Sequence, residues 1–301
     1  MPLPERPALS ERRSFERRES KGTLYVVATP IGNLEDITLR ALKTFRTVQL
    51  VAAEDTRRTG NLLRHFNIDV PIISVHEHNE QARVQKILGR LAKGESVALV
   101  TDAGTPGVSD PGAALVAAIR LEGFRIEPIP GASAVAAAIS AAGIASDGFT
   151  FLEFPPIRSK DRKLWFAALE ASAKDRAVVF FEAPHKLRRT LEDLAILVNR
   201  PIFVGRELTK LHEELVWATP IELLSKFDNP YGEFTLIVPP GEAVAPAKEA
   251  PSDEDISDLV GQITEIERPK SKREAARIAG ERLGLTAKLV YQALERVKIG
   301  Q

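Results

Sequence analysis

Cysteine is absent from this chain of 301 residues, and methionine occurs once. The absence of cysteine excludes disulfides, thiolate metal ligands and cysteine nucleophiles, and it is consistent with a reducing, cytoplasmic location. Net charge is also absent, because 41 Lys and Arg balance 41 Asp and Glu. The total charge therefore does not indicate nucleic-acid binding, and any basic surface has to arise from local segregation of charge.

Long apolar runs are missing as well, since none approaches the roughly 20 residues that a membrane helix needs. Residues 1–21 are rich in charge and proline and lack the apolar stretch of a signal peptide. We expect a disordered arm over 1–21, with weak RNA contact as the alternative. The sequence predicts no membrane association.

The common nucleotide-binding fingerprints are missing too. No G-x-G-x-x-G run follows the first apolar stretch, which disfavours a dinucleotide site. Gly107 and Gly112 have the outer spacing of a P-loop, but Ala113 and Ala114 replace its Lys and Ser/Thr, which excludes nucleoside triphosphate binding. What remains is a glycine-rich loop with one carboxylate, Asp102, which suits a ligand that carries a cation, hydroxyls or an amino acid group.

Apolar, β-branched stretches alternate with amphipathic ones through the first half of the chain. This alternation is typical of an α/β lobe built on a mostly parallel sheet, here over residues 22–145. The expected strands are 23–28, 48–53, 72–75, 96–101 and 124–129, and the expected helices are 38–45, 79–92, 111–122 and 132–142.

Residues 146–159 break this rhythm with glycine and a proline pair, and we place the start of a second α/β lobe, 146–240, there. Two lobes predict a ligand cleft between them. The second lobe should hold helices at 161–172 and 185–197 and strands at 177–182, 202–206 and 232–238.

A proline- and alanine-rich linker, 241–252, precedes a small all-α tail, 253–301. Its amphipathic helices are expected near 255–266, 272–283 and 287–297, with Gly284 at the turn of a helix-turn-helix. Residues 268–301 contain nine Lys or Arg and three Glu, which is an excess of six positive charges. The tail is therefore expected to contact nucleic-acid phosphates, with dimerisation or docking to another protein as the alternative.

Four loops carry residue types that strands and helices do not need. Ligands of open α/β sheets bind beyond the carboxyl ends of the strands, where all four should lie, so we expect a binding site there. Turn chemistry alone would also explain each loop taken singly. The loops are 29–34, 53–57, 101–112 and 130–133.

Several long motifs resemble those of one family, the ribosomal RNA small-subunit methyltransferase I family of the tetrapyrrole methylase superfamily. The resemblance extends in register from about residue 22 to residue 240, and the tail over 271–294 also resembles that of the family. The motifs are LYVVATPIGNLEDITLRAL (24–42), AAEDTR (52–57), SVHEHNE (74–80), ALVTDAGTPGVSDPG (98–112), PIPGASA (128–134), FFEAPHK (180–186) and RELTKLHEE (206–214).

The resemblance implies a two-lobed tetrapyrrole-methylase-like α/β fold with S-adenosylmethionine in the cleft, followed by the helix-turn-helix-like tail. It implies methyl transfer to the ribose 2′-hydroxyl of a cytidine in the decoding region of small-subunit (16S) ribosomal RNA. The partners implied are an assembled small ribosomal subunit and a second copy of the chain. The cofactor contacts implied by position are Ile31, Asp102, Ala103, Gly104, Thr105, Ser133, Ala134, Phe181 and Glu182.

A ribose hydroxyl gains from a base that takes its proton during attack, and His185 is the leading candidate, with Glu182 as the other. Helix-terminal structure or contact with RNA phosphate would equally explain His185, and Glu182 is better suited to holding the cofactor. We expect substrate contacts from Glu54, Asp55 and Arg57, with a buried ion-pair network as their alternative, and from Arg206 and Lys210, with an ordinary solvated surface as theirs.

No metal site is predicted, because His76 and His78 have no further ligands beside them. The chain departs from the family's usual motifs at Glu153-Phe154-Pro155-Pro156 and at Pro130-Gly131-Ala132-Ser133. Two rival functions stay open: a methylase that acts on a tetrapyrrole, and a non-catalytic RNA-binding assembly factor.

Overall fold

The computed structural model describes residues 21–76, 79–241, 253–267, 269, 271–283 and 289–294. The expected arm over residues 1–21 lies outside the described residues except for Lys21, and the expected linker lies outside them after Gly241. The chain divides into two units, residues 1–243 and 244–301.

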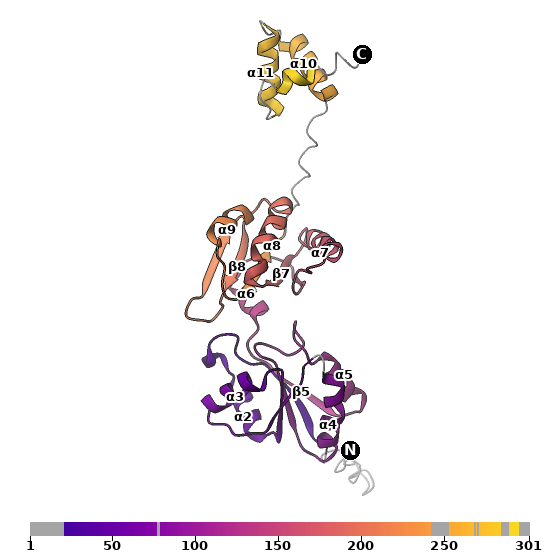
Figure 1. The fold of residues 1–301 in the computed structure, drawn as a ribbon, viewed down its shortest axis with the longest axis vertical. Helices are drawn as coiled ribbons and strands as arrows, with labels where there is room; N and C mark the ends of the chain where they lie inside the picture. Colours follow the sequence, from indigo (N-terminus) through magenta and orange to yellow (C-terminus); the bar gives the residue numbers. More distant parts are fainter. Residues whose placement is uncertain are drawn as a thin grey trace, which may run out of the picture. The chain divides into compact units, whose positions relative to one another are not determined.

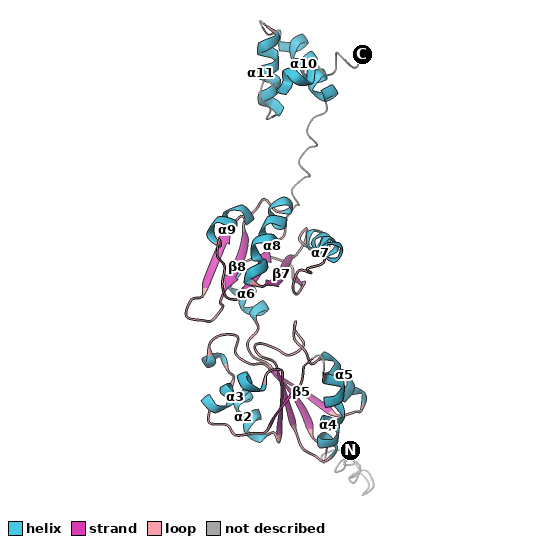
Figure 2. Ribbon diagram, viewed as in Figure 1, coloured by secondary structure: helices cyan, strands magenta, loops and turns pink. Residues whose placement is uncertain are grey.

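The first unit contains two α/β lobes, each with its own five-stranded sheet (Figures 1 and 2). The first sheet is parallel, in the order β3-β2-β4-β1-β5, as the alternation predicts. Its strands are β1 (Thr23–Val27), β2 (Leu50–Ala53), β3 (Ile72–Ser74), β4 (Val97–Val100) and β5 (Arg125–Ile129).

Helices cover both faces of the first sheet. Along β2, Val51 and Ala53 are buried against α2 (Leu39–Thr47) and α3 (Thr56–His65), while Leu50 and Ala52 are buried toward α4 (Glu80–Ala92) and α5 (Ala113–Leu121). Every β2 residue is therefore apolar, because alternate side chains enter two different cores. A short 3-10 helix, η1 (Leu34–Asp36), follows β1.

The second sheet is mixed, in the order β6-β7-β10-β8-β9. Strand β6 is parallel to β7, and the other neighbours are antiparallel. Its strands are β6 (Phe149–Phe151), β7 (Ala177–Glu182), β8 (Ile202–Arg206), β9 (Glu214–Ala218) and β10 (Phe234–Val238). The helices α7 (Ser159–Ser172), α8 (Pro184–Leu197) and α9 (Pro220–Lys226) form the core on one face.

The other face of the second sheet is covered by α6 (Ala134–Ala142), which the sequence placed in the first lobe. Val135, Ala138 and Ala142 are buried with Val179 of β7 and Ile237 of β10. The expected lobe boundary at 145/146 is therefore wrong, because α6 packs with the second lobe. Its alanines have small side chains, which let the helix approach the sheet closely.

Five elements were not predicted: η1, α3, β6, β9 and α9. The sequence of α3, TRRTGNLLRH, is mostly polar and has only Thr59 and Leu63 buried, so its periodicity is weak. Strand β6 is three residues long, and β9 alternates half-buried with exposed residues at the edge of the sheet.

The second unit contains α10 (Asp253–Glu267), α11 (Lys272–Leu283) and a helical segment at 289–294. Its core joins Ile256 and Ile263 to Ala276 and Val290, so the first two helices form as expected and residues 289–294 agree with part of the third. Gly284 lies outside the described residues. No helix in the described ranges is long and apolar enough to cross a membrane.

Candidate functional site

The four loops singled out in the sequence meet at the carboxyl edge of the first sheet. Thr29 and Gly104 exchange backbone hydrogen bonds of 2.8 and 3.0 Å, which joins the first loop to the third. Thr105 Oγ1 donates to the carbonyl of Ala132 at 3.2 Å, which joins the third to the fourth. The backbone N–H of Asp102 donates to Glu54 Oε2 at 3.2 Å, which joins the third to the second.

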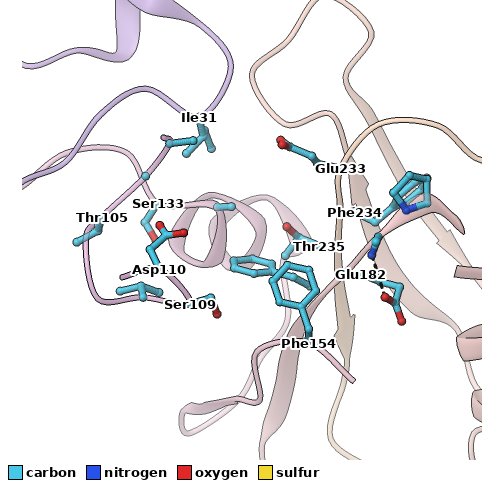
Figure 3. A pocket seen from close by; sticks show the side chains of 17 residues that line it. Ile31, Thr105, Ser109, Asp110, Ser133, Phe154, Glu182, Glu233, Phe234 and Thr235 are labelled. Carbon is cyan, nitrogen blue, oxygen red and sulfur yellow. Dashed lines mark hydrogen bonds between the residues drawn. The ribbon is translucent and has the colours of Figure 1, made fainter. Parts of the chain in front are cut away.

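A cavity of about 340 Å³ lies between this loop edge and the second lobe (Figure 3). Figure 3 shows Ile31, Thr105 and Ser133 on one side of it and Glu233, Phe234 and Thr235 on the other. The volume is within the range of small-molecule sites. The remaining lining residues are Ala103, Gly104, Val108, Ser109, Asp110, Ala134, Phe154, Phe181, Glu182, Ala183 and Pro184.

The lining suits an uncharged or cationic ligand. Apolar and aromatic side chains alternate with hydroxyls, and three carboxylates, Asp110, Glu182 and Glu233, lie at the cavity. None of the described residues that line it is Lys, Arg or His, so a phosphate group would find no cationic side chain there. A ligand with a sulfonium, an amino group and hydroxyls would find oppositely charged carboxylates and hydrogen-bonding hydroxyls in this lining. S-adenosylmethionine has all three groups.

Eight of the nine expected cofactor contacts line this cavity, the exception being Asp102. Asp102 lies at a neighbouring depression, where its Oδ1 accepts from the N–H of Asp55 at 3.0 Å and its Oδ2 pairs with Arg58 at 3.4 Å. Its carboxylate therefore orders the second and third loops. A direct ligand contact from Asp102 stays a prediction.

Glu182 is 2% exposed, and protein groups occupy both of its carboxylate oxygens. Oε1 accepts from the N–H of Ala183 at 2.8 Å, and Oε2 accepts from the hydroxyl of Thr190. Arg162 donates to the same hydroxyl at 2.9 Å and pairs with Asp193 at 2.7 Å. This network holds the Glu182 carboxylate in place at the end of β7, next to the start of α8. Its roles as a base and as a cofactor contact stay predictions.

His185 is exposed in the first turn of α8 and does not line the cavity, although its neighbour Pro184 does. The geometry of the cavity therefore does not support its role as a base, which stays a prediction. Contact with RNA at the surface stays open, as does a structural role at the helix terminus.

Asp55 and Arg57 do not form a buried network with Glu54, so that alternative is wrong. The Asp55 side chain caps α3 by accepting from the N–H of Arg57 at 2.8 Å, and it pairs with a guanidinium that is 88% exposed. Hydrogen bonds from the Arg57 side chain hold the pKa of Asp55 at about 2. Arg57 and its neighbour Arg58 are exposed cations beside the loop edge.

Arg206 is the last residue of β8 and Lys210 lies in the loop from β8 to β9, and each is paired with carboxylates. Arg206 pairs with Glu214 at 3.0 Å and lies 4.4 Å from the ring centre of Tyr231. Lys210 pairs with Glu207 at 2.8 Å and with Glu233 at 3.0 Å. Their expected contacts with RNA stay predictions, and the pair of Lys210 with Glu233 places Lys210 next to the cavity.

Gly32 brings the two lobes together at this point. A Cβ on Gly32 would lie 2.8 Å from the carbonyl oxygen of Leu208 and 2.4 Å from Cγ of Lys210. The next residue, Asn33, donates its N–H to Thr209 Oγ1 at 3.0 Å. Only glycine leaves room for this contact between the first loop and the β8–β9 loop.

Ser109 and Asp110 line the cavity and were not among the expected site residues. They belong to a loop that the sequence singled out, but Pro111 and Gly112 beside them suggested a turn. Burial raises the pKa of Asp110 to about 6, with the carboxylates of Glu54 and Asp102 adding to the rise and the Thr101 hydroxyl opposing it. Across the described ranges, no group of three His, Cys, Asp or Glu is placed to hold a metal.

The family model for tetrapyrrole (corrin/porphyrin) methylases matches residues 23–224. The X-ray structure of a cobalamin biosynthetic enzyme, cobalt precorrin-4 methyltransferase, is similar with a TM-score of 0.54 and 17% identity, covering 71% of this chain and 94% of that one. The fold and the cavity at its strand ends thus define a methyltransferase of the tetrapyrrole methylase class.

Two relatives carry the name ribosomal RNA small subunit methyltransferase I. The one from Synechocystis sp. is 41% identical over 90% of this chain and 96% of its own length. The one from Thermotoga maritima is 44% identical over 72% of this chain and 98% of its own length. Within the class, the chain therefore belongs to the ribosomal RNA small subunit methyltransferase I family.

Proposed function

We propose that the protein transfers a methyl group from S-adenosylmethionine to the 2′-hydroxyl of a cytidine in the decoding region of small-subunit (16S) ribosomal RNA. The observation that carries the proposal is the cavity at the strand ends, which eight of the nine expected cofactor contacts line. The chain is also 41% identical to a relative named ribosomal RNA small subunit methyltransferase I. Such a substrate places the reaction in the cytoplasm.

Different residues of the cavity would make different kinds of contact with the cofactor. Gly104 has a φ of 75°, a conformation that favours glycine, and lines the cavity without a side chain, while Phe154 and Phe181 offer aromatic faces 5.5 Å apart at their ring centres. When bound, S-adenosylmethionine supplies a methyl group that is already activated on a sulfonium. The protein then mainly has to align the ribose oxygen in line with that carbon.

The exposed guanidinium groups of Arg57 and Arg58 support binding of RNA beside the cavity. Arg57 is 88% exposed and Arg58 66% exposed at the same loop edge. Phosphate contacts from such groups position a nucleic acid without reading its sequence. Choice of the nucleotide is better assigned to the cavity, which an unstacked cytidine would enter.

The protein is further proposed to act as a homodimer. Leu215 and Trp217 point from the β9 edge to the α6 face of the second sheet, and each is 46% exposed. Helix α6 contacts β10 and β7, and β9 is at the far edge of the sheet order. Sedimentation should give a dimer that Trp217→Glu converts to a monomer, whereas a monomeric wild type would contradict this part of the proposal.

The experiment that tests the function measures transfer of a tritiated methyl group to three acceptors. These are small subunits from cells that lack the methylation, free rRNA and a tetrapyrrole. We expect label in RNA, with assembled subunits the better acceptor. Label in the tetrapyrrole alone would establish the first rival function, and cofactor binding with no transfer would establish the second.

A further inference from the structure

We propose that Asp110 accepts the proton of the methylated hydroxyl and that the Ser109 hydroxyl positions the acceptor group beside it. The inference rests on the proposed function and names the base of that same site. Both residues lie on the first-lobe side of the cavity with Thr105 and Ser133 (Figure 3).

The Ser109 hydroxyl is buried and has no hydrogen-bond partner among the described residues. Leaving a buried hydroxyl unpaired costs free energy, so such a group at a cavity calls for a ligand partner. Its backbone also has a φ of 61°, which is uncommon for a residue other than glycine. Strained residues of this kind persist where the surrounding structure holds them, often at functional sites.

Asp110 follows directly and is a half-buried carboxylate at the same cavity. The ionisable groups that act on it are Glu54 and Asp102, and Arg58 pairs with Asp102 at 3.4 Å. Glu182 and Glu233 are the other carboxylates of the lining. Glu182 already accepts two hydrogen bonds, and Glu233 is 72% exposed and paired with Lys210. Asp110 accepts one hydrogen bond, from the Thr101 hydroxyl, and has no cationic partner of its own among the groups that act on its pKa, so it is the carboxylate of the cavity best placed to take a proton.

The step balances with the groups named. The ribose 2′-oxygen forms a bond to the methyl carbon as the bond from sulfur to that carbon breaks, and the electron pair of the broken bond stays on sulfur. The 2′-hydroxyl proton moves to the Asp110 carboxylate, which releases it to solvent after the product leaves. A carboxyl group that ionises near pH 6 combines the deprotonated form at neutral pH with more basicity than an ordinary aspartate.

The test compares full-length wild type with Asp110→Asn, His185→Ala and the control Asp69→Asn, which removes an exposed carboxylate of the same lobe. Turnover on small subunits is measured against pH, and S-adenosylmethionine binding is measured separately by calorimetry. Asp110→Asn should lower turnover by at least about 100-fold, far more than it lowers cofactor affinity, and should lack the fall in rate below about pH 6 that we expect of wild type.

A second pair of variants tests the hydroxyl independently. Ser109→Ala and Ser109→Gly both remove Oγ, but only glycine relieves the positive φ. Both should lower turnover by about tenfold with cofactor binding retained, because the acceptor loses its hydrogen bond.

The proposal is overturned if Asp110→Asn turns over normally, if its loss equals its loss of cofactor binding, or if the pH-dependent loss occurs in His185→Ala instead. Normal turnover in Ser109→Gly would also remove the role of the hydroxyl. A wild type that transfers no methyl group to RNA would refute the proposed function instead, so the two failures can be told apart.

Discussion

The carboxyl group of Asp110 lies where burial and neighbouring carboxylates oppose its ionisation. Its pKa is raised from 3.8 to about 6, so the folded protein binds its proton more tightly than the unfolded chain does. Stability from this group is fully present below about pH 4 and is lost as the pH rises to about 6.

Asp110→Asn should therefore stabilise the protein at pH 7.5 by roughly 1–2 kcal/mol, after allowance for solvent screening at a half-exposed group. At pH 4 the gain should vanish, because the wild-type group is largely protonated there in the folded state. Urea unfolding of both proteins at the two pH values measures this difference. Equal stabilisation at both values would show that the pKa of Asp110 is not raised.

Thr190 holds one oxygen of the buried Glu182 carboxylate and is itself fully buried. Thr190→Val keeps the side-chain shape but leaves that oxygen and one Arg162 N–H without their partner. We expect a loss of about 1–3 kcal/mol in the free energy of unfolding. The exposed Thr47→Val at the end of α2 is the control, and an equal loss there would remove the special role of the network.

The contact between loops 29–34 and 207–213 is the element-scale feature that joins the two lobes beside the cavity. Gly32→Ala would place a Cβ 2.8 Å from the backbone oxygen of Leu208, which cannot rotate away as a side chain could. The loops must separate, at about 1–3 kcal/mol, and calorimetry should show weaker cofactor binding.

Gly89→Ala is the matched control for this change, because no atom lies within 4 Å of its added Cβ in α4. It should bind the cofactor normally and be slightly more stable, since alanine favours the helix. Normal binding in Gly32→Ala would mean that the close approach has no part in forming the site.

Sequence patterns predicted the first sheet and its four loops well because each buried parallel strand is a continuous apolar run. They assigned α6 to the wrong sheet, because an apolar helix face has the same sequence pattern whichever sheet it packs against. They also failed for β9, where Leu215 and Trp217 face outward at an edge. Ser109 could not be identified from its sequence position, because both its positive φ and its unpaired hydroxyl arise from packing of the loop.

At the scale of the whole molecule, the chain joins a catalytic unit to a separate tail, in which the basic residues gather over 268–301. The Thermotoga maritima relative is matched over 98% of its own length by only 72% of this chain, so methyltransferases of this family exist with a much shorter chain. The tail should therefore add RNA affinity without being needed to build the cavity.

Removal of residues 244–301 should leave S-adenosylmethionine binding intact and weaken binding to small subunits. The slope of log affinity against log salt should become shallower by up to about 4 if all six excess charges contact phosphates. Full-length protein with Arg273→Gln and Arg277→Gln should give part of this change. An unchanged salt slope in the truncated protein would instead favour protein docking or dimerisation by the tail.

The central claim is the position of the methyl group, and alkaline hydrolysis mapping tests it directly. A ribose 2′-O-methyl group blocks cleavage of the adjoining phosphodiester, because the 2′-oxygen can no longer attack it. Small-subunit rRNA treated with the protein and S-adenosylmethionine should gain one protected position, at a cytidine of the decoding region. Incorporation of a methyl group with no protected position would contradict the account, because the methyl group would then be on a base.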